Sequence, residues 1–390
     1  MVKFYFMTIS KYGDIIGANL LRTLRKKTHN VDFYGVGGPK MGLDKVIEYE
    51  KLNDNMYLND DCSKICCDNI GVFADIMRVK PDVIISIGNW DFCKEIYKKI
   101  NNSCHCSKVI IVHYVAPNVF YKGERFIKEM SEQIDLLVSI YPQEVKCANK
   151  YKLPCTYVGH PMTEIRCVNS NLTEFYRRIS LAPQQKFLTA LFETNLDDVK
   201  RNLPYILEVG KAIQNRKPEL TFVLLSSGKI LAYIQEHVEK SQSKAIVLDE
   251  EKDLDNVISM TKVAIATSEK GTLKFSFADI PHVVAYKEPP AKRFRLGKSK
   301  HFHFLNLVNL ILEKNIIPIY FNYSYNPKNI KNSVLTLLNN EEIYKNQIEA
   351  FHELKYLLLN GKKSSSENAA DAILSFVRGL MCVNGSCVYL

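Results

Sequence analysis

The sequence lacks several features that would assign it to other broad classes. No apolar run reaches the roughly 18 residues that a membrane-spanning helix needs. Ser10, Lys11 and Asp14 interrupt the N-terminal apolar run, so it does not form a signal-peptide core. The G-x-G-x-x-G fingerprint of dinucleotide-binding domains does not follow the first predicted strand. We therefore expect a cytoplasmic protein that is not a dinucleotide-dependent oxidoreductase.

The 11 cysteines do not form the paired C-x-x-C pattern of a structural zinc site. Free thiols in a reducing compartment are the simpler interpretation, so we predict neither a metal nor a cofactor. The formal net charge of +10 suits a nucleotide or an anionic membrane face, and a lysine-rich proteome explains it equally well. The basic residues form no repeated aromatic–basic module, so we expect no nucleic-acid partner.

Apolar strands alternate with amphipathic helices on both sides of a polar stretch near residues 163–185. The predicted strands are residues 2–9, 31–37, 82–88, 108–115, 136–141 and 155–159, then 186–192, 220–228, 244–249, 262–267 and 282–287. This alternation is typical of parallel sheets covered by helices on both faces. The sequence therefore predicts two α/β domains in series.

Ligands of open parallel sheets bind where strands end, so residues after the predicted strands are the site candidates. Gly13 allows a tight turn before a helix whose N-terminus suits an anion or a hydroxyl-rich ligand. Asp91 is either a proton acceptor for a substrate hydroxyl or the N-cap of the next helix. The polar-aromatic stretch at residues 113–121 suits a sugar or an acyl group. His160 is either a base or ligand contact at the domain junction or an ordinary packed histidine.

In this order, the strand ends resemble the lipid-A-disaccharide synthase family. The matching motifs are G-D-I-x-G-A at residues 13–18, G-x-x-G-P-x-M at 35–41, K-P-D with D-F at 80–92, H-Y-V-x-P-x-V at 113–119, P-x-E at 142–144, K-Y-x-x-P-C at 150–155 and G-H at 159–160. These pieces agree in order and spacing, and the second half of the chain is similar in layout.

The resemblance implies an α/β fold of the GT-B type. Two Rossmann-like domains with doubly wound parallel sheets would face a cleft, and C-terminal helices would cross back to the first domain. Residues 1–165 with helices in 345–390 would bind the acceptor, and residues 166–344 would bind the UDP-sugar. The implied enzyme is a metal-free glycosyltransferase. It condenses UDP-2,3-diacylglucosamine with 2,3-diacylglucosamine 1-phosphate to give lipid A disaccharide 1-phosphate and UDP.

Candidate site residues follow from the same motifs. The catalytic candidates are Asp91 as the base, with His113 and His160. The acceptor-binding candidates are Gly13, Asp14, Tyr114, Asn118, Arg125 and Glu144. The nucleotide-binding candidates are Asn195, Ser268, Gly271, Thr272, Lys274 and Asn309.

Several positions depart from the family's motifs, and three of them bear on the alternative function. Gly88 replaces the first aspartate of G-I-D-x-P-D-F, and Asn195 replaces the arginine of L-P-G-S-R. Lys274 stands where the resemblance implies a glutamate that meets ribose hydroxyls, and an ammonium can only donate hydrogen bonds. These changes favour an alternative function, a catalytically impaired homologue that binds a UDP-sugar or lipid without turnover.

A basic stretch with interleaved phenylalanines is typical of contact with an anionic membrane, although an exposed helix end explains it too. Because the implied substrates are lipids, we expect peripheral association with the inner membrane. The residues expected to make this contact are Lys292, Arg293, Arg295, Lys298 and Lys300.

Overall fold

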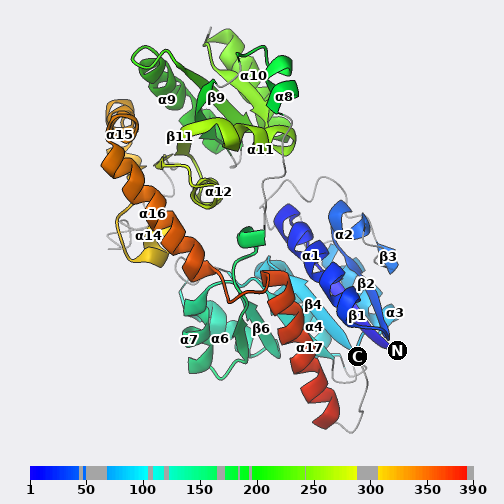
Figure 1. Cartoon of the computed structure of the whole chain (residues 1–390). Coiled ribbons are helices and arrows are strands. Elements are labelled where there is room, and N and C mark those ends of the chain that lie inside the picture. Colours follow the sequence, from blue (N-terminus) through cyan, green and yellow to red (C-terminus); the bar gives the residue numbers. More distant parts are fainter. Residues whose placement is uncertain are drawn as a thin grey trace. The chain divides into compact units, whose positions relative to one another are not determined.

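A computed structural model describes residues 1–43, 47–49, 68–103, 109–117, 123–164, 172–182, 185–192, 196–241, 243–287 and 306–383. Its contacts divide the chain into two compact units, Met1–Glu164 with Leu358–Leu390, and Ile165–Leu357. Each unit is built on one parallel sheet with helices around it (Figure 1). The predicted α/β fold with two parallel sheets is therefore confirmed.

The first unit has a seven-stranded parallel sheet in the order β3-β2-β1-β4-β5-β6-β7. The strands are β1 Val2–Met7, β2 Val31–Val36, β3 Ile47–Tyr49, β4 Val83–Ile87, β5 Ile110–Tyr114, β6 Leu136–Ser139 and β7 Cys155–Tyr157. The central strands β4 and β5 are buried along their whole length, as expected for strands covered on both faces. Their register places Ser86 beside His113 and Ile87 beside Tyr114.

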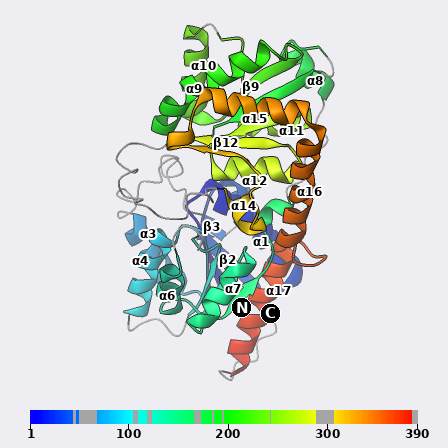
Figure 2. The same ribbon diagram turned by 90° about the vertical axis from the view of Figure 1, so that its left-hand side faces the viewer.

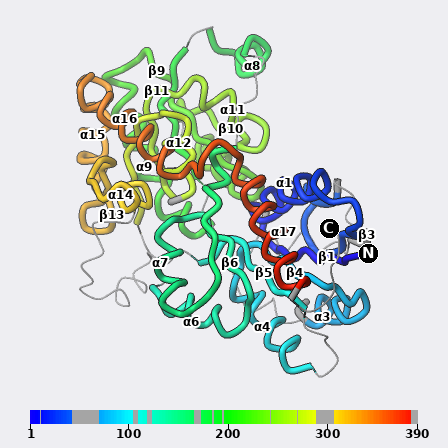
Figure 3. The backbone as a smooth tube through the Cα atoms, turned by 60° about the horizontal axis from the view of Figure 1, so that its bottom comes forward, coloured from blue at the N-terminus to red at the C-terminus, as the bar shows by residue number. Residues whose placement is uncertain are grey.

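Helices connect these strands and cover both faces of the sheet. They are α1 Lys11–Lys27, α2 Pro39–Leu43, α3 Asp68–Val79, α4 Trp90–Asn101, α6 Arg125–Ser131, α7 Pro142–Lys150, the short η3 Pro161–Glu164 and the C-terminal α17 Ser365–Val383. Helix α17 packs beside α1 (Figure 3), and the Lys27 ammonium lies 2.6 Å from the Asp371 carboxylate. The predicted return of the C-terminal helices to the first domain is thus confirmed for α17.

The second unit has a six-stranded parallel sheet in the order β10-β9-β8-β11-β12-β13. Its strands are β8 Lys186–Leu191, β9 Leu220–Ser226, β10 Ile246–Asp249, β11 Thr261–Ala266, β12 His282–Tyr286 and β13 Ile319–Phe321. Its helices are α8 Leu172–Arg178, α9 Leu196–Gln214, α10 Gly228–Lys240, α11 Glu250–Met260, α12 Glu269–Phe277, α14 Leu307–Leu312, η5 Asn322–Ser324, α15 Pro327–Asn339 and α16 Glu341–Leu358. Figure 2 shows α15 lying along β12.

The boundary between the units differs from the predicted one at the C-terminal end. We predicted a return to the first domain at residue 345, whereas the structure returns at Leu358. The reason is that α16 packs on the second unit. Its Gln347 amide accepts from the backbone N–H of His282 at 2.9 Å and donates to the backbone oxygen of His282 at 3.3 Å. Lys355 of α16 also pairs with Asp279 at 2.6 Å.

Candidate functional site

The loop after β1 forms a tightly packed helix N-terminus. Ser10 is the N-cap of α1, and its hydroxyl accepts a hydrogen bond from the Gly13 amide at 3.0 Å. A side chain at position 13 would bring its Cβ within 2.1 Å of the Thr8 hydroxyl. Position 13 therefore requires glycine because the surrounding atoms leave no room for a side chain.

Asp14 in the same turn is buried and binds the neighbouring loop. Its carboxylate accepts hydrogen bonds from the backbone amides of Gly38 at 2.9 Å, Lys40 at 2.9 Å and Met41 at 3.0 Å. These contacts join two of the sequence motifs, since Gly38–Met41 belongs to the G-x-x-G-P-x-M segment. The structure thus uses Asp14 to hold the entry to α2 against the first turn of α1.

Asp91 lies at the carboxyl end of β4, in the first turn of α4. The N-cap of α4 is Asn89, in the left-handed conformation at φ 45°, so the alternative interpretation of Asp91 as the N-cap is wrong. The Asp91 side chain is 38% exposed, and one of its oxygens lies 2.7 Å from the Lys94 ammonium. Asp91 is therefore a partly solvated carboxylate at the edge where ligands of parallel sheets bind.

His113 is buried on β5 beneath the turn that carries Asp91. Its Nδ1 lies 2.5 Å from the Ser86 hydroxyl, which also accepts from the Tyr97 hydroxyl, and its ring meets the Trp90 indole edge-on at 5.3 Å. Burial lowers the pKa of His113 to about 3, so the imidazole is neutral at physiological pH. This arrangement makes His113 part of the support beneath the turn.

His160 is also buried, at the end of the segment after β7. Its Nδ1 accepts from the Met162 amide at 3.2 Å, and its Nε2 lies 3.3 Å from the Tyr141 hydroxyl. Burial lowers the pKa of His160 to about 3. The backbone amide of His160 donates to the Leu358 oxygen at 2.9 Å, which ties the two chain segments that lead to the second unit.

The remaining acceptor-side candidates have contrasting environments. Tyr114 is buried, and its hydroxyl lies 3.1 Å from the Ser365 hydroxyl at the start of α17. Arg125 is exposed at the first turn of α6. Asn118 lies outside the described residues. The structure therefore leaves Arg125 facing solvent and places Tyr114 in a contact within the first unit.

Glu144 is fully buried in the first turn of α7 and is held by Ser139. The Ser139 hydroxyl is hydrogen-bonded to one carboxyl oxygen, and the other oxygen has no hydrogen-bond partner among the described residues. Burial raises the pKa of Glu144 to about 8, so its carboxyl group is protonated over much of the neutral range. A neutral carboxylic acid can donate to the Ser139 hydroxyl, which in turn donates to the Tyr141 oxygen at 2.7 Å.

In the second unit, the turn after β11 forms a capped helix N-terminus. Ser268 is the N-cap of α12, and its hydroxyl accepts from the Gly271 amide at 3.0 Å. The Thr272 hydroxyl donates to the Ser268 oxygen at 3.1 Å. Lys274 is paired with Glu250, the first residue of α11. Sequence reasoning missed Glu250, because no spacing rule connects residues 24 positions apart.

Asn309 uses its side chain inside the second unit. Its amide oxygen accepts from the amides of Ile316 and Ile317, and its nitrogen donates to the Ile317 oxygen at 2.9 Å. Asn195 lies outside the described residues, as does the whole basic stretch predicted to contact a membrane, Lys292, Arg293, Arg295, Lys298 and Lys300. Within the described helices, none is both long and apolar enough to cross a bilayer.

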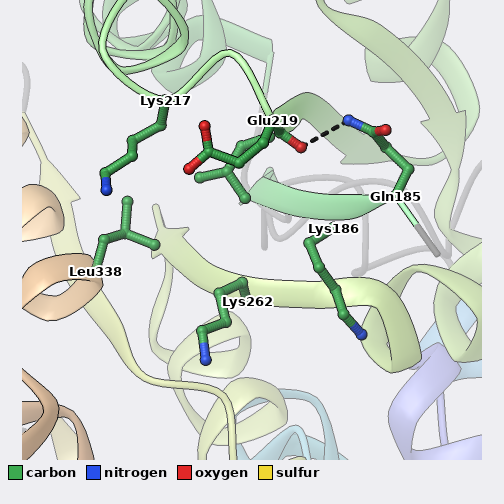
Figure 4. A pocket seen from close by; sticks show the side chains of 7 residues that line it. Gln185, Lys186, Lys217, Glu219, Lys262 and Leu338 are labelled. Atoms are coloured by element: carbon green, nitrogen blue, oxygen red, sulfur yellow. Dashed lines mark hydrogen bonds between the residues drawn. The ribbon is translucent and has the colours of Figure 1, made fainter.

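A surface hollow of about 430 Å³ lies at the opposite edge of the second sheet, where the strands begin (Figure 4). Three lysines, Lys186, Lys217 and Lys262, line it together with Glu219. Gln185 closes one side through a 2.7 Å hydrogen bond from its amide nitrogen to the Glu219 backbone oxygen. Because parallel sheets bind ligands at the carboxyl ends of their strands, this hollow stands apart from the candidate site.

Comparison with solved structures identifies the fold. The structure of S. aureus MnaA with UDP has a TM-score of 0.67 at 13% identity, covering all of this chain and 98% of that one. The UDP-GlcNAc 2-epimerase of Methanocaldococcus jannaschii, in complex with UDP-GlcNAc and UDP, has a TM-score of 0.64 at 13% identity, covering 96% of this chain and 100% of that one. At this identity the likeness shows the shared GT-B-like fold.

Comparison of sequences identifies the family. The lipid-A-disaccharide synthase of Rhodospirillum centenum is 26% identical over 381 residues, covering 94% of this chain and 92% of that protein. The Nitrobacter winogradskyi enzyme of the same name is 25% identical over 384 residues, covering 96% of each. Residues 4–373 match the family model described as lipid-A-disaccharide synthetase. Because that match spans nearly the whole sequence, the chain belongs to the lipid-A-disaccharide synthase family.

Proposed function

We propose that this protein is a glycosyltransferase of lipid A biosynthesis. It joins UDP-2,3-diacylglucosamine to 2,3-diacylglucosamine 1-phosphate and releases UDP. The observation that carries the proposal is the family match over residues 4–373. In the reaction, an acceptor hydroxyl oxygen attacks the anomeric carbon of the donor. The bond from that carbon to the UDP oxygen breaks, and UDP leaves with the bonding electrons.

Asp91 is the proposed base that takes the proton of the attacking hydroxyl. It is a partly solvated carboxylate at a strand end, and the Trp90 side chain beside it is buried, which fixes the backbone of the turn. A positioned general base contributes roughly 10²–10⁴-fold to rate. His113 and His160 are buried and neutral, so we assign them to the support of the acceptor side.

The acceptor side of the first unit offers two kinds of contact. Arg125 is exposed and carries a permanent charge suited to the phosphate of the acceptor. Gly13, Asp14, Tyr114 and Glu144 shape and stabilise the same edge of the sheet through the contacts described above. We propose that Asn118 completes this side as a hydrogen-bonding residue.

The donor nucleotide is proposed to bind at the carboxyl edge of the second sheet. Helix α12 presents its N-terminus there, with Ser268, Gly271 and Thr272 in the first turns. A helix N-terminus favours negative charge, which suits the developing charge of the UDP leaving group. Lys274 adds an ammonium close to this turn, and Asn195 and Asn309 are the other proposed donor-side residues.

The alternative of a binding protein without turnover rests on the departures at Gly88, Asn195 and Lys274. A family match over nearly the whole chain does not favour that alternative.

We also propose that the protein meets its lipid substrates at the inner-membrane surface, through the basic residues of 292–300. Charge reversal of Lys292 and Arg293 should weaken binding to anionic vesicles, and unchanged binding would contradict the membrane proposal.

The test of the proposed base follows UDP release from the two lipid substrates. Asp91→Asn keeps the size of the side chain and removes the proton acceptor, so its rate should fall roughly 10²–10⁴-fold. Glu95→Gln is the matched control, because Glu95 lies one turn further along α4 and is 48% exposed. Equal rates for Asp91→Asn and Glu95→Gln would remove Asp91 from the mechanism.

A further inference from the structure

Helix α4 carries a charged pair that includes the proposed base. The Lys94 ammonium lies 2.7 Å from an oxygen of Asp91, three residues earlier on the same helix. The two side chains are 23% and 38% exposed, so the pair is only partly open to water. A hydrogen bond between two charged groups at this distance is among the stronger side-chain contacts.

The same ammonium reaches a second carboxylate on α6. Glu129 has one oxygen 3.8 Å from Lys94, and its other oxygen accepts from the Trp90 indole nitrogen at 3.2 Å. Trp90 is buried against the ring of His113, as described above. Trp90 directly precedes Asp91 in the chain. The contacts Asp91–Lys94, Lys94–Glu129 and Glu129–Trp90 therefore form a closed ring of interactions that includes the proposed base.

The charges in this ring keep Lys94 protonated. The pKa of Lys94 is raised above its usual value, chiefly by the hydrogen bond to Asp91, with smaller contributions from the charges of Glu129 and Glu95. Glu95 lies on α4 and Glu129 on α6, and among the described residues these are the other charged groups that face the ammonium. Lys94 therefore stays cationic at any pH at which an enzyme of this kind would be assayed.

We propose that Lys94 is the positioning residue for Asp91. It holds the carboxylate in one orientation and favours its ionised form. This inference rests on the proposed role of Asp91 as the base. A carboxylate can act as a base only when it is ionised. A fixed ammonium beside it keeps the carboxylate ionised at lower pH. The anchoring of Lys94 by Glu129 limits how far the pair can move.

The experiment compares pH–rate profiles of UDP release for the wild type and Lys94→Met. Without the ammonium, the acid side of the profile should move to higher pH by roughly 0.5–1 pH unit, because an opposite charge at this distance favours the ionised carboxylate and partial exposure weakens the effect. Lys94→Arg should restore the wild-type profile. Lys98→Met is the matched control, since Lys98 pairs with Glu95 on the same helix at 2.9 Å and is 49% exposed.

Each outcome has a distinct meaning. A Lys94→Met profile that superposes on the wild type, while Asp91→Asn is inactive, overturns the role of Lys94 and leaves the proposed function intact. Activity retained by Asp91→Asn overturns both. If the wild type shows no turnover, a ¹³C NMR titration of the Asp91 carboxyl group tests the effect of Lys94 directly. The signal of Asp91 is identified by its absence from the spectrum of Asp91→Asn. An Asp91 titration that is the same in Lys94→Met and in the wild type overturns the proposal. Circular dichroism checks that Lys94→Met is folded, and Lys94→Gln serves if it is not.

Discussion

The Lys274 ammonium on α12 is paired with the carboxylate of Glu250, which begins α11 at the end of β10. The two side chains are 21% and 13% exposed, so both charges are largely withdrawn from water. The resemblance implies an acidic residue at the position of Lys274. The structure shows that a carboxylate nevertheless reaches this helix, from a different strand end. The charge of Lys274 is therefore balanced locally by Glu250.

This pairing predicts a specific loss of stability in Lys274→Met. The change leaves the Glu250 carboxylate without its ammonium partner, which should cost about 1–3 kcal/mol of unfolding free energy. Urea denaturation measures the loss, and Lys270→Met provides the control, because Lys270 is exposed one turn earlier on the same helix. The swapped pair Lys274→Glu with Glu250→Lys should regain part of the loss. A Lys274→Met protein as stable as the control would contradict the account.

The fold could be predicted from the sequence because its central strands are continuous apolar runs separated by helices. Two strands are not predicted by the apolar pattern, β3 and β13, which have three residues each and lie at the edges of their sheets. A run of three residues has too short a pattern to separate a strand from a loop. The helix α16 was assigned to the wrong unit, because its amphipathic pattern does not say which sheet its Gln347 and Lys355 contact.

The candidate site could be predicted only in part. The carboxyl ends of the strands, and with them Asp91 and Ser268, follow from the strand pattern. The contacts of Asp14, Glu144 and Lys274 do not, because their partners lie elsewhere in the chain or on a face that periodicity leaves open. The i, i+3 spacing of Asp91 and Lys94 is a signal in the sequence that could have pointed to their pairing.

The raised pKa of Glu144 predicts that the stability of the protein falls as pH rises. Burial raises its pKa to about 8 in the folded protein, from 4.5 in the unfolded chain. The folded state therefore binds this proton more tightly, and the stabilisation is full below pH 4.5 and is lost as pH rises toward 8. Glu144→Gln, which stays neutral, should gain stability relative to the wild type between pH 5 and pH 8.

Denaturation curves of both proteins at several pH values give this difference. Glu132→Gln is the control, since Glu132 is exposed in the same unit. If the difference between Glu144→Gln and the wild type does not change with pH, Glu144 is ionised in the folded protein.

The lowered pKa of His160 predicts that the stability of the protein falls as pH decreases in the acid range. Burial lowers its pKa to about 3, below the 6.5 of an unperturbed histidine, so the unfolded chain binds the extra proton. Stability should fall as pH drops from 6.5 toward 3, with a slope of up to about 1.4 kcal/mol per pH unit for this residue. His160→Gln should have a shallower slope than His29→Gln, in which an exposed histidine is replaced. Equal slopes would show that His160 is not held neutral.

The hydrogen bond between Tyr114 and Ser365 is expected to stabilise the packing of α17 on the first unit. The Ser365 hydroxyl donates to the Gly159 oxygen at 2.8 Å, so the Tyr114 hydroxyl donates to Ser365. Tyr114→Phe removes that hydrogen bond and should lower the unfolding free energy by about 0.5–1.5 kcal/mol in the ligand-free protein. Tyr323→Phe, at a tyrosine that is 96% exposed, should have no effect. A loss confined to substrate binding, with stability unchanged, would instead assign Tyr114 to the acceptor.

The most direct measurement mixes the purified protein with UDP-2,3-diacylglucosamine and 2,3-diacylglucosamine 1-phosphate, then follows UDP and the lipid product by mass spectrometry. The proposed function predicts equal amounts of UDP and disaccharide 1-phosphate, and formation of neither when the acceptor is left out. Binding of UDP without any disaccharide product would contradict it and would support the alternative of a binding protein.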